Sequence, residues 1–360
     1  MTVPSVGTAE QARPSPAARR RRAVVMLVVL LALVAVAAWG AVTVLDRLMA
    51  GPADYPGPGQ GEVVIEVLPG DTAGDIGATL ADADVVASQA AFVDAAAADD
   101  RSLGIQPGSY AMAEQMSGQG ALERLLDPAA RVQTQVTIPE GLRLDQTVAR
   151  LVEASGLPVA DFEKALRRPA RLGLPPYANG SAEGFLFPAT YTFDPGVSAT
   201  EMLRAMVDRF DQAAVELDLV ASSKAVGLTP RQAVTVGSLV QAEVGEADFG
   251  KAARVVYNRL NQGMPLQFDS TVNYALGSDD LTLTNDQLGV DSPYNTYAHP
   301  GLPPGPINSP GQAALEAALN PPAGDWVYFV ALAPGSDKTR FTSDYAEFLV
   351  WKDEFYAAVP

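Results

Sequence analysis

One segment limits how this chain can fold more than any other: Ala23–Leu45, in which every residue is uncharged and nearly all are apolar. As a helix rising about 1.5 Å per residue, it is long enough to cross a hydrocarbon core about 30 Å thick. A cleaved signal peptide is the alternative, but the apolar core of such a peptide usually has only about 7–15 residues. We therefore predict an uncleaved transmembrane helix over residues 23–45.

A cluster of arginines, Arg19–Arg22, comes directly before this segment. Because positive charge tends to stay on the cytoplasmic side, we expect a cytoplasmic N-terminus, with everything after Asp46 outside. Residues 1–22 are rich in Pro, Ala and Ser and are predicted to form a disordered, basic tail. The whole chain has a net charge of −17, so the part beyond this tail is strongly acidic and a nucleic-acid partner is not expected.

The composition is that of a folded protein with few catalytic options. With 360 residues, 48% of them hydrophobic, the chain is long enough for two folded units. It has no cysteine, which excludes disulfides, thiol catalysis and zinc–thiolate sites. Its only histidine is His299, so a histidine-based triad or a multi-histidine metal site is not expected. We predict neither a metal nor a cofactor.

Proline and glycine mark the boundary after the predicted membrane helix, where residues 46–61 read as a linker. Residues 62–130 then show the pattern of a strand, two helices and a second strand. This β-α-α-β pattern resembles a LysM glycan-binding module. Residues 131–360 follow as a larger domain, and the predicted fold class is α+β.

Hydrophobic periodicity predicts the elements of the larger domain. Strands are expected at 132–138 and 326–331, and helices at 144–154, 160–166, 199–217, 249–262, 311–319 and 344–355. The aromatic run 183–191 is predicted to be a buried strand, and residues 266–274 a short strand-like segment.

A further predicted helix, capped by Thr229 and by Gly245, carries a carboxylate on its apolar face. At helical spacing, Glu243 falls between Leu239 and Val240. Burial and the negative end of the helix dipole both raise a carboxyl pKa, which suits a general acid. The structural alternative is that Glu243 reaches solvent at the helix end or pairs with an arginine. Periodicity alone does not choose between the two.

Arg259 lies on the apolar face of the next predicted helix, where an arginine usually has a carboxylate partner. Asp269, Glu183 and Glu243 are the candidates. Beyond it, residues 266–307 are rich in Pro, Gly, aromatic and amide side chains. Because proline restricts the backbone and sugar rings pack well on aromatic faces, this region predicts the wall of a sugar-binding cleft.

Several motifs make the chain resemble the endolytic murein transglycosylase family (MltG, or YceG-like). They are IPEG at 138–141, EGFLFPATY at 183–191, SLVQAE at 238–243, VYNRL at 256–260, LQFDSTVNYALG at 266–277, SPYNTY at 292–297 and GLPPGPINSPG at 301–311. The similarity runs from about Glu62 to Phe355, with the apolar segment in the place of the family's anchor.

The resemblance implies that residues 131–360 are a catalytic domain and that Glu243 is the catalytic residue. Members often carry a second glutamate two positions earlier, where this chain has Gln241. Substrate-binding roles are implied for the other matching positions: Glu183, Gln267, Asp269, Tyr294, Asn295 and Tyr297. Arg259 is expected to give structural support.

The implied enzyme is a lytic transglycosylase at the bacterial plasma membrane. It would cleave the β-1,4 bond between N-acetylmuramic acid and N-acetylglucosamine in nascent peptidoglycan, leave 1,6-anhydro ends and so terminate strand elongation. The implied partners are peptidoglycan synthases and the division or elongation machinery.

Two alternatives remain open from the sequence. One is a glycoside hydrolase of the muramidase type, in which Asp269 or Glu183 activates water. The other is a non-catalytic scaffold that binds peptidoglycan and positions cell-wall synthases.

Overall fold

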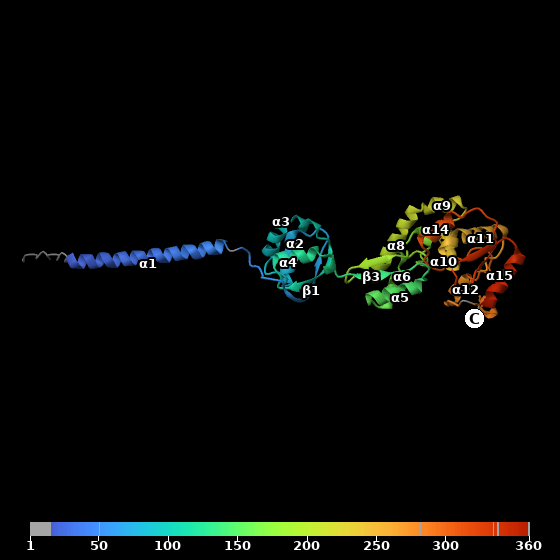
Figure 1. Cartoon of the computed structure of the whole chain (residues 1–360), viewed down its shortest axis with the longest axis horizontal. Coiled ribbons are helices and arrows are strands. Elements are labelled where there is room, and N and C mark those ends of the chain that lie inside the picture. Colours follow the sequence, from blue (N-terminus) through green and yellow to red (C-terminus); the bar gives the residue numbers. More distant parts are fainter. Residues whose placement is uncertain (1–15, 50, 281, 334, 337, 359–360) are drawn as a thin grey trace, which may run out of the picture. The chain divides into compact units, whose positions relative to one another are not determined.

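The computed structural model describes residues 16–358 apart from residues 50, 281, 334 and 337, and it divides into two compact units, Met1–Arg131 and Val132–Pro360 (Figure 1). Helix α1, Pro16–Met49, contains a stretch at Val24–Val44 that is long and apolar enough to cross a membrane. Residues 16–22, predicted to be disordered, are helical, whereas residues 1–15 of the predicted tail lie outside the described part. The helix also continues into the predicted linker.

The first folded unit has the predicted order of strand, helix, helix, strand. Strand β1 (Gln60–Val67) pairs antiparallel with β2 (Gly108–Glu114), and its remaining elements are α2 (Ala73–Asp82), α3 (Gln89–Ala98), η1 (Asp100–Gly104), α4 (Gly118–Leu126) and η2 (Pro128–Ala130). Leu80, Phe92, Tyr110 and Leu122 are almost fully buried in its core. The resemblance to a LysM module stays a prediction.

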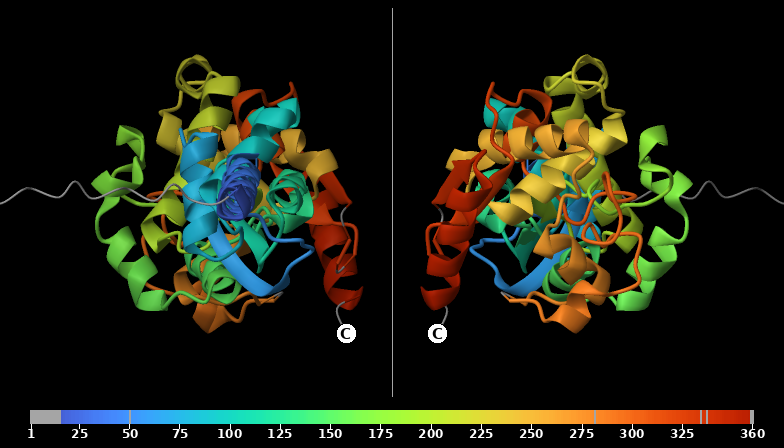
Figure 2. Two further views of the ribbon diagram at one scale, coloured as in Figure 1. Left: turned by 90° about the vertical axis from the view of Figure 1, so that its left-hand side faces the viewer. Right: turned by 90° about the vertical axis from the view of Figure 1, so that its right-hand side faces the viewer.

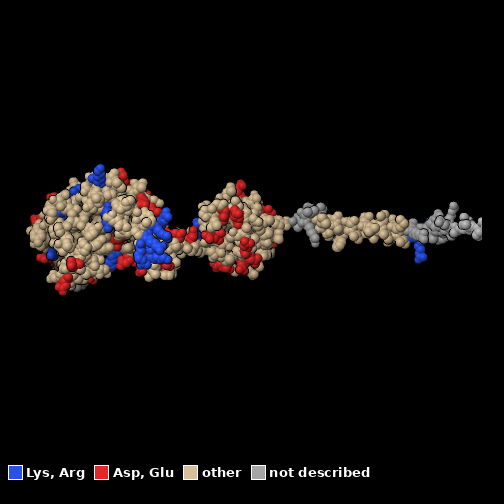
Figure 3. Space-filling model, turned by 180° about the vertical axis from the view of Figure 1, so that it is seen from behind, with Lys and Arg blue, Asp and Glu red and all other residues tan. Residues whose placement is uncertain are grey.

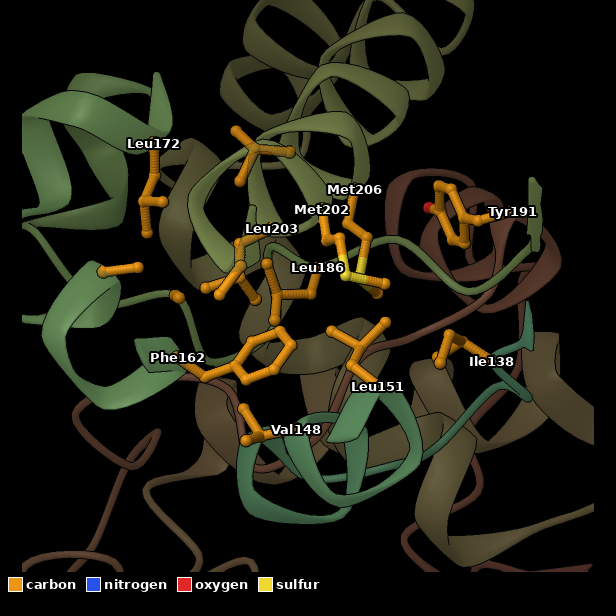
Figure 4. Packing of buried hydrophobic residues seen from close by; sticks show 14 of the residues in the cluster. Ile138, Val148, Leu151, Phe162, Leu172, Leu186, Tyr191, Met202, Leu203 and Met206 are labelled. Atoms are coloured by element: carbon orange, nitrogen blue, oxygen red, sulfur yellow. The ribbon is translucent and has the colours of Figure 1, made fainter. Parts of the chain in front are cut away.

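The second unit begins with a small sheet covered by helices. Strand β3 (Thr134–Thr137) pairs antiparallel with β4 (Thr190–Phe193), and the other elements of this half are α5 (Leu144–Ser155), α6 (Val159–Leu166), α7 (Pro169–Leu172), η3 (Pro176–Ala178) and α8 (Ala199–Glu216). Figure 4 shows their shared core, in which Phe162 and Leu151 face Leu186, Met202 and Met206. All five side chains are fully buried, so this core fixes α5, α6 and α8 against each other.

The remainder of the second unit is built around one buried helix. Its elements are α9 (Leu219–Ala225), α10 (Pro230–Glu243), η4 (Glu246–Asp248), α11 (Phe249–Gln262), α12 (Asp269–Leu276), α13 (Asn285–Leu288), α14 (Gln312–Leu319), β5 (Tyr328–Ala331), β6 (Thr339–Thr342) and α15 (Tyr345–Ala358). Strands β5 and β6 are antiparallel. Figure 2 shows α5 and α6 (green) and α15 (red) on opposite sides of this unit. The α+β class is thus confirmed.

Helix α10 is buried on all sides between Ala233 and Val240. It is capped as predicted at its start, where the Thr229 hydroxyl accepts from the Gln232 N–H. Gly237 allows α14 to approach, since a Cβ there would lie 3.1 Å from Leu315. A helix enclosed in this way holds its last residue, Glu243, in a fixed position.

Three local predictions were wrong. The C-cap of α10 is Val244, whose extended backbone ends the helix one residue before the predicted Gly245. Residues 266–274 were predicted to be strand-like, but from Asp269 onward they belong to helix α12, which Gly277 closes in a left-handed conformation. The run 183–191 is irregular until Thr190, where β4 begins.

Candidate active site

The carboxyl group of Glu243 meets the first turn of α12. The Ser270 hydroxyl donates a hydrogen bond of 2.5 Å to Glu243 Oε1. Glu243 is half-buried, so its side chain remains partly accessible to a bound molecule. This is the arrangement that a proton donor to a bound substrate needs.

Burial raises the pKa of Glu243 to about 7, and the negative charge of Asp269 acts in the same direction. The Ser270 hydrogen bond and the more distant charge of Arg259 oppose this rise. The position of Glu243 at the C-terminal end of α10 also favours the neutral form. A carboxyl with such a pKa is substantially protonated at neutral pH.

Arg259 on α11 is buried, and its guanidinium group bonds to the backbone of two neighbouring segments. Its Nε donates to the Val327 carbonyl at 2.7 Å, and its Nη1 donates to the Leu266 carbonyl. Within the described residues it makes no ion pair with any of its three candidate carboxylates. The guanidinium therefore joins α11 to two other segments and affects Glu243 only through its charge. The predicted structural role fits this geometry, whereas the expected carboxylate partner was wrong.

Asp269 and Tyr297 form a second polar pair near Glu243. The Tyr297 hydroxyl donates to Asp269 Oδ1 at 2.5 Å, and burial together with this carboxylate raises the pKa of the Tyr297 hydroxyl. Beneath them, the Phe268 N–H donates to Thr296 Oγ1 at 2.9 Å. These bonds fix the loop containing SPYNTY against α12.

Asn295 is completely buried, and its side-chain amide is used within its own loop. Its Nδ2 donates to the carbonyls of Leu288 and Val290, both at 2.9 Å, and its Oδ1 accepts from the Tyr297 N–H. This geometry favours a role in shaping the loop over the predicted contact with substrate. Its neighbour Tyr294 is only half-buried.

Glu183 is a second buried carboxyl, only 7% exposed. It accepts hydrogen bonds from the Leu144 N–H at 3.1 Å and from the Tyr274 hydroxyl at 3.2 Å. Burial raises the pKa of Glu183 to about 7, and these two hydrogen bonds oppose the rise. The Tyr274 ring lies 4.7 Å from the Tyr294 ring, measured between centroids. Glu183 thus joins α5 to the aromatic pair.

Gln267 is exposed beside these groups and has a strained backbone, with φ of 52°. Non-glycine residues rarely adopt this left-handed conformation, and those that do cluster at functional sites. The Gln267 N–H donates to the Thr296 carbonyl at 3.2 Å, which helps to hold the conformation. The strained backbone places the Gln267 amide at the surface, close in the chain to Asp269 and Ser270.

We expect Gln267→Gly to raise the free energy of unfolding by about 1 kcal/mol, because glycine adopts positive φ without strain. Gln267→Ala is the matched control, since it removes the amide but keeps the strain. Thermal unfolding should separate the two variants, while kcat/KM should fall by about tenfold in both if the amide binds substrate. Equal stability of the two variants would contradict the role given to backbone strain.

Sequence reasoning missed the importance of Ser270, Tyr274 and Thr296. All three act through contacts with residues distant in the chain, so their spacing gives no signal. Ser270 stood inside the motif LQFDSTVNYALG without any assigned role.

A family model described as the YceG-like family matches residues 65–354. The chain belongs to the YceG-like family. The Bacillus subtilis protein named endolytic murein transglycosylase is 31% identical to it over 82% of this chain and 85% of that protein. A Streptococcus pneumoniae protein of the same name is 32% identical over 63% of this chain, which spans 46% of that longer protein.

A solved structure of this family shows the same fold. The crystal structure of a putative yceG-like protein from Listeria monocytogenes matches with a TM-score of 0.54 and 30% identity, covering 80% of this chain and 98% of that one. The predicted family is confirmed, and the names of the curated YceG-like relatives agree with the predicted class of enzyme, a lytic transglycosylase.

Proposed function

We propose that this chain is a membrane-anchored endolytic transglycosylase of peptidoglycan and that Glu243 is its catalytic acid. The observation that supports the role of Glu243 most directly is its half-buried side chain, whose carboxyl accepts from the Ser270 hydroxyl and has a pKa raised to about 7. The names of the YceG-like relatives support peptidoglycan as the substrate.

The proposed reaction needs only one carboxyl group. Protonated Glu243 donates its proton to the oxygen between C1 of N-acetylmuramic acid and N-acetylglucosamine, and the C1–O bond breaks. The C6 hydroxyl of the same muramic acid then attacks C1, and its proton passes to Glu243. The product ends in a 1,6-anhydro ring, and the acid is regenerated. An internal nucleophile gains from proximity and removes the need for activated water.

The other two carboxyl groups are less suited to activating water, as a hydrolase would require. Asp269 Oδ1 already accepts the Tyr297 hydroxyl. Glu183 is buried and accepts from a backbone N–H and from Tyr274. We therefore propose that Asp269 orients Tyr297. Glu183 would hold Tyr274, whose ring packs on Tyr294. Gln267, Tyr294 and Tyr297 are proposed to contact the sugars, and Asn295 to shape the loop.

The proposed location follows from α1. Its apolar stretch is consistent with a single membrane anchor, and the preceding arginines favour a cytoplasmic N-terminus with the enzyme outside. Cleaving strands near the membrane would terminate their elongation. We also propose that the enzyme contacts peptidoglycan synthases and the division or elongation machinery.

Mass spectrometry of digested glycan strands tests this function. We expect fragments whose muramic acid ends lack one water, as the anhydro product requires. Fragments with ordinary reducing ends would instead indicate a hydrolase. No release of fragments by folded protein would favour the scaffold alternative.

A further inference from the structure

A basic cavity lies in the second unit, formed by residues outside the candidate active site. Figure 3 shows Lys and Arg side chains gathered in one area of this unit's surface, in a chain whose net charge is −17. The cavity has a volume of about 420 Å³, and Lys164, Arg168 and Arg171 line it. Its size lies within the range of small-molecule sites.

In the part of the chain that the structure describes, no ion pair explains the grouping of the three cations. Within the described residues, none of them forms an ion pair with a carboxylate, although Asp161 lines the same cavity. The neighbouring Arg167 differs, because it pairs with Glu163 at 3.7 Å and does not line the cavity. Like charges held close together repel each other unless an anion lies between them.

The rest of the lining indicates which anion would fit. Ser198, the N-cap of α8, also lines the cavity, but its N–H and hydroxyl already donate to the Glu201 carboxylate, so the cations and not this helix end would attract an anion. Leu157 and Val197 add apolar surface to the lining. A bare phosphate has no use for apolar walls, whereas an acidic peptide with small apolar side chains would contact both kinds of surface.

We propose that this cavity binds the short acidic peptides attached to the glycan, through their carboxylates. The proposal rests on the proposed function, because peptidoglycan strands carry such peptides along their length. Arginine suits carboxylates through its planar fork of N–H donors. Holding one peptide of the strand would position the sugars that the enzyme cleaves, so the peptides would contribute to substrate affinity and not to the chemical step.

Direct titration tests binding without relying on activity. The full chain in detergent micelles is titrated with a synthetic stem tetrapeptide that ends in D-alanine, and the heat of binding is measured by isothermal titration calorimetry. Replacing Lys164, Arg168 and Arg171 together by Gln should weaken binding about tenfold, since exposed ion pairs are individually weak. Arg168→Gln alone should weaken it about two- to threefold, and Arg167→Gln should leave it unchanged. Equal binding by all variants, or tighter binding of inorganic phosphate than of the peptide, would overturn the proposal.

The kinetics of strand cleavage test whether peptide binding in the cavity contributes to substrate affinity. Wild-type protein should cleave peptide-bearing strands with a KM about tenfold lower than strands stripped of peptides by an amidase. The triple variant should lose this difference while kcat stays unchanged, as expected for uniform binding. If the difference persists in the triple variant, the cavity does not bind the peptides of the substrate. If wild-type protein cleaves neither kind of strand, the proposed function fails, and the titration still decides the cavity.

Discussion

Replacing Glu243 by glutamine is expected to reduce kcat for strand cleavage by about 10³-fold, within the range found for the loss of a general acid. Glutamine has nearly the same shape and can still accept from Ser270, so the variant should remain folded and bind glycan. The exposed Glu246, three residues further along the chain, provides a control, and Glu246→Gln should retain full activity. An active Glu243→Gln protein would remove Glu243 from the mechanism.

The pH dependence provides a second test of the same residue. A donor must be protonated, and the pKa of Glu243 is raised to about 7 by burial. We therefore expect kcat/KM of the free enzyme to fall tenfold per pH unit well above pH 7. Ser270→Ala removes a hydrogen bond that lowers this pKa, so the descending limb should move to higher pH. A limb that stays in place would show that another group controls the profile.

Local spacing was enough to predict the elements that matter most for Glu243. The N-cap at Thr229 and the apolar positions of α10 are determined by nearest neighbours along the chain, so the helix and the inward position of its last carboxyl could be predicted. The end of the helix could not, because Val244 leaves the helical conformation before the glycine that usually marks such an end. Capping residues indicate where a helix tends to end, but the packing of α10 against α11 and α12 determines where this helix does end.

The segment just before helix α12 shows why the rest of the site was harder to predict. Leu266 and Phe268 are buried and alternate with exposed Gln267, which is the pattern of a strand. They lie instead in an irregular segment held by the Arg259 and Thr296 side chains. Arg259 lies on helix α11, and Thr296 lies 28 residues beyond Phe268. No local periodicity in the sequence therefore reveals these two contacts.

Asn295 illustrates a related limit. An amide offers the same donors and acceptors to a sugar as to the backbone of its own loop. From the motif SPYNTY alone, the two uses are indistinguishable, and only burial separates them. The same uncertainty applied to Glu183, whose hydrogen bond from Leu144 joins residues 39 positions apart.

Glu183 leads to the second large expected effect, on stability. Its folded pKa is raised to about 7, above the ordinary value of 4.5 for this group, because burial disfavours the charged form. Its contribution to stability is therefore complete below about pH 4.5 and is lost as the pH rises through 7. Glutamine is neutral at every pH, so Glu183→Gln should gain about 3 kcal/mol relative to wild type between pH 4 and pH 8.

Thermal unfolding of the full chain in detergent, followed by near-ultraviolet circular dichroism, measures this gain. At pH 8 the melting temperature of Glu183→Gln should exceed that of wild type by about 6–12 °C, and at pH 4 the two should nearly coincide. Because Glu243 also has a raised pKa, the comparison is best made in a Glu243→Gln background, with exposed Glu153→Gln as the matched control on α5. A difference that does not change with pH would mean that Glu183 is not held neutral in the folded protein. It would then be a charged residue whose role is to bind through its carboxylate, and the water-activating alternative would regain support.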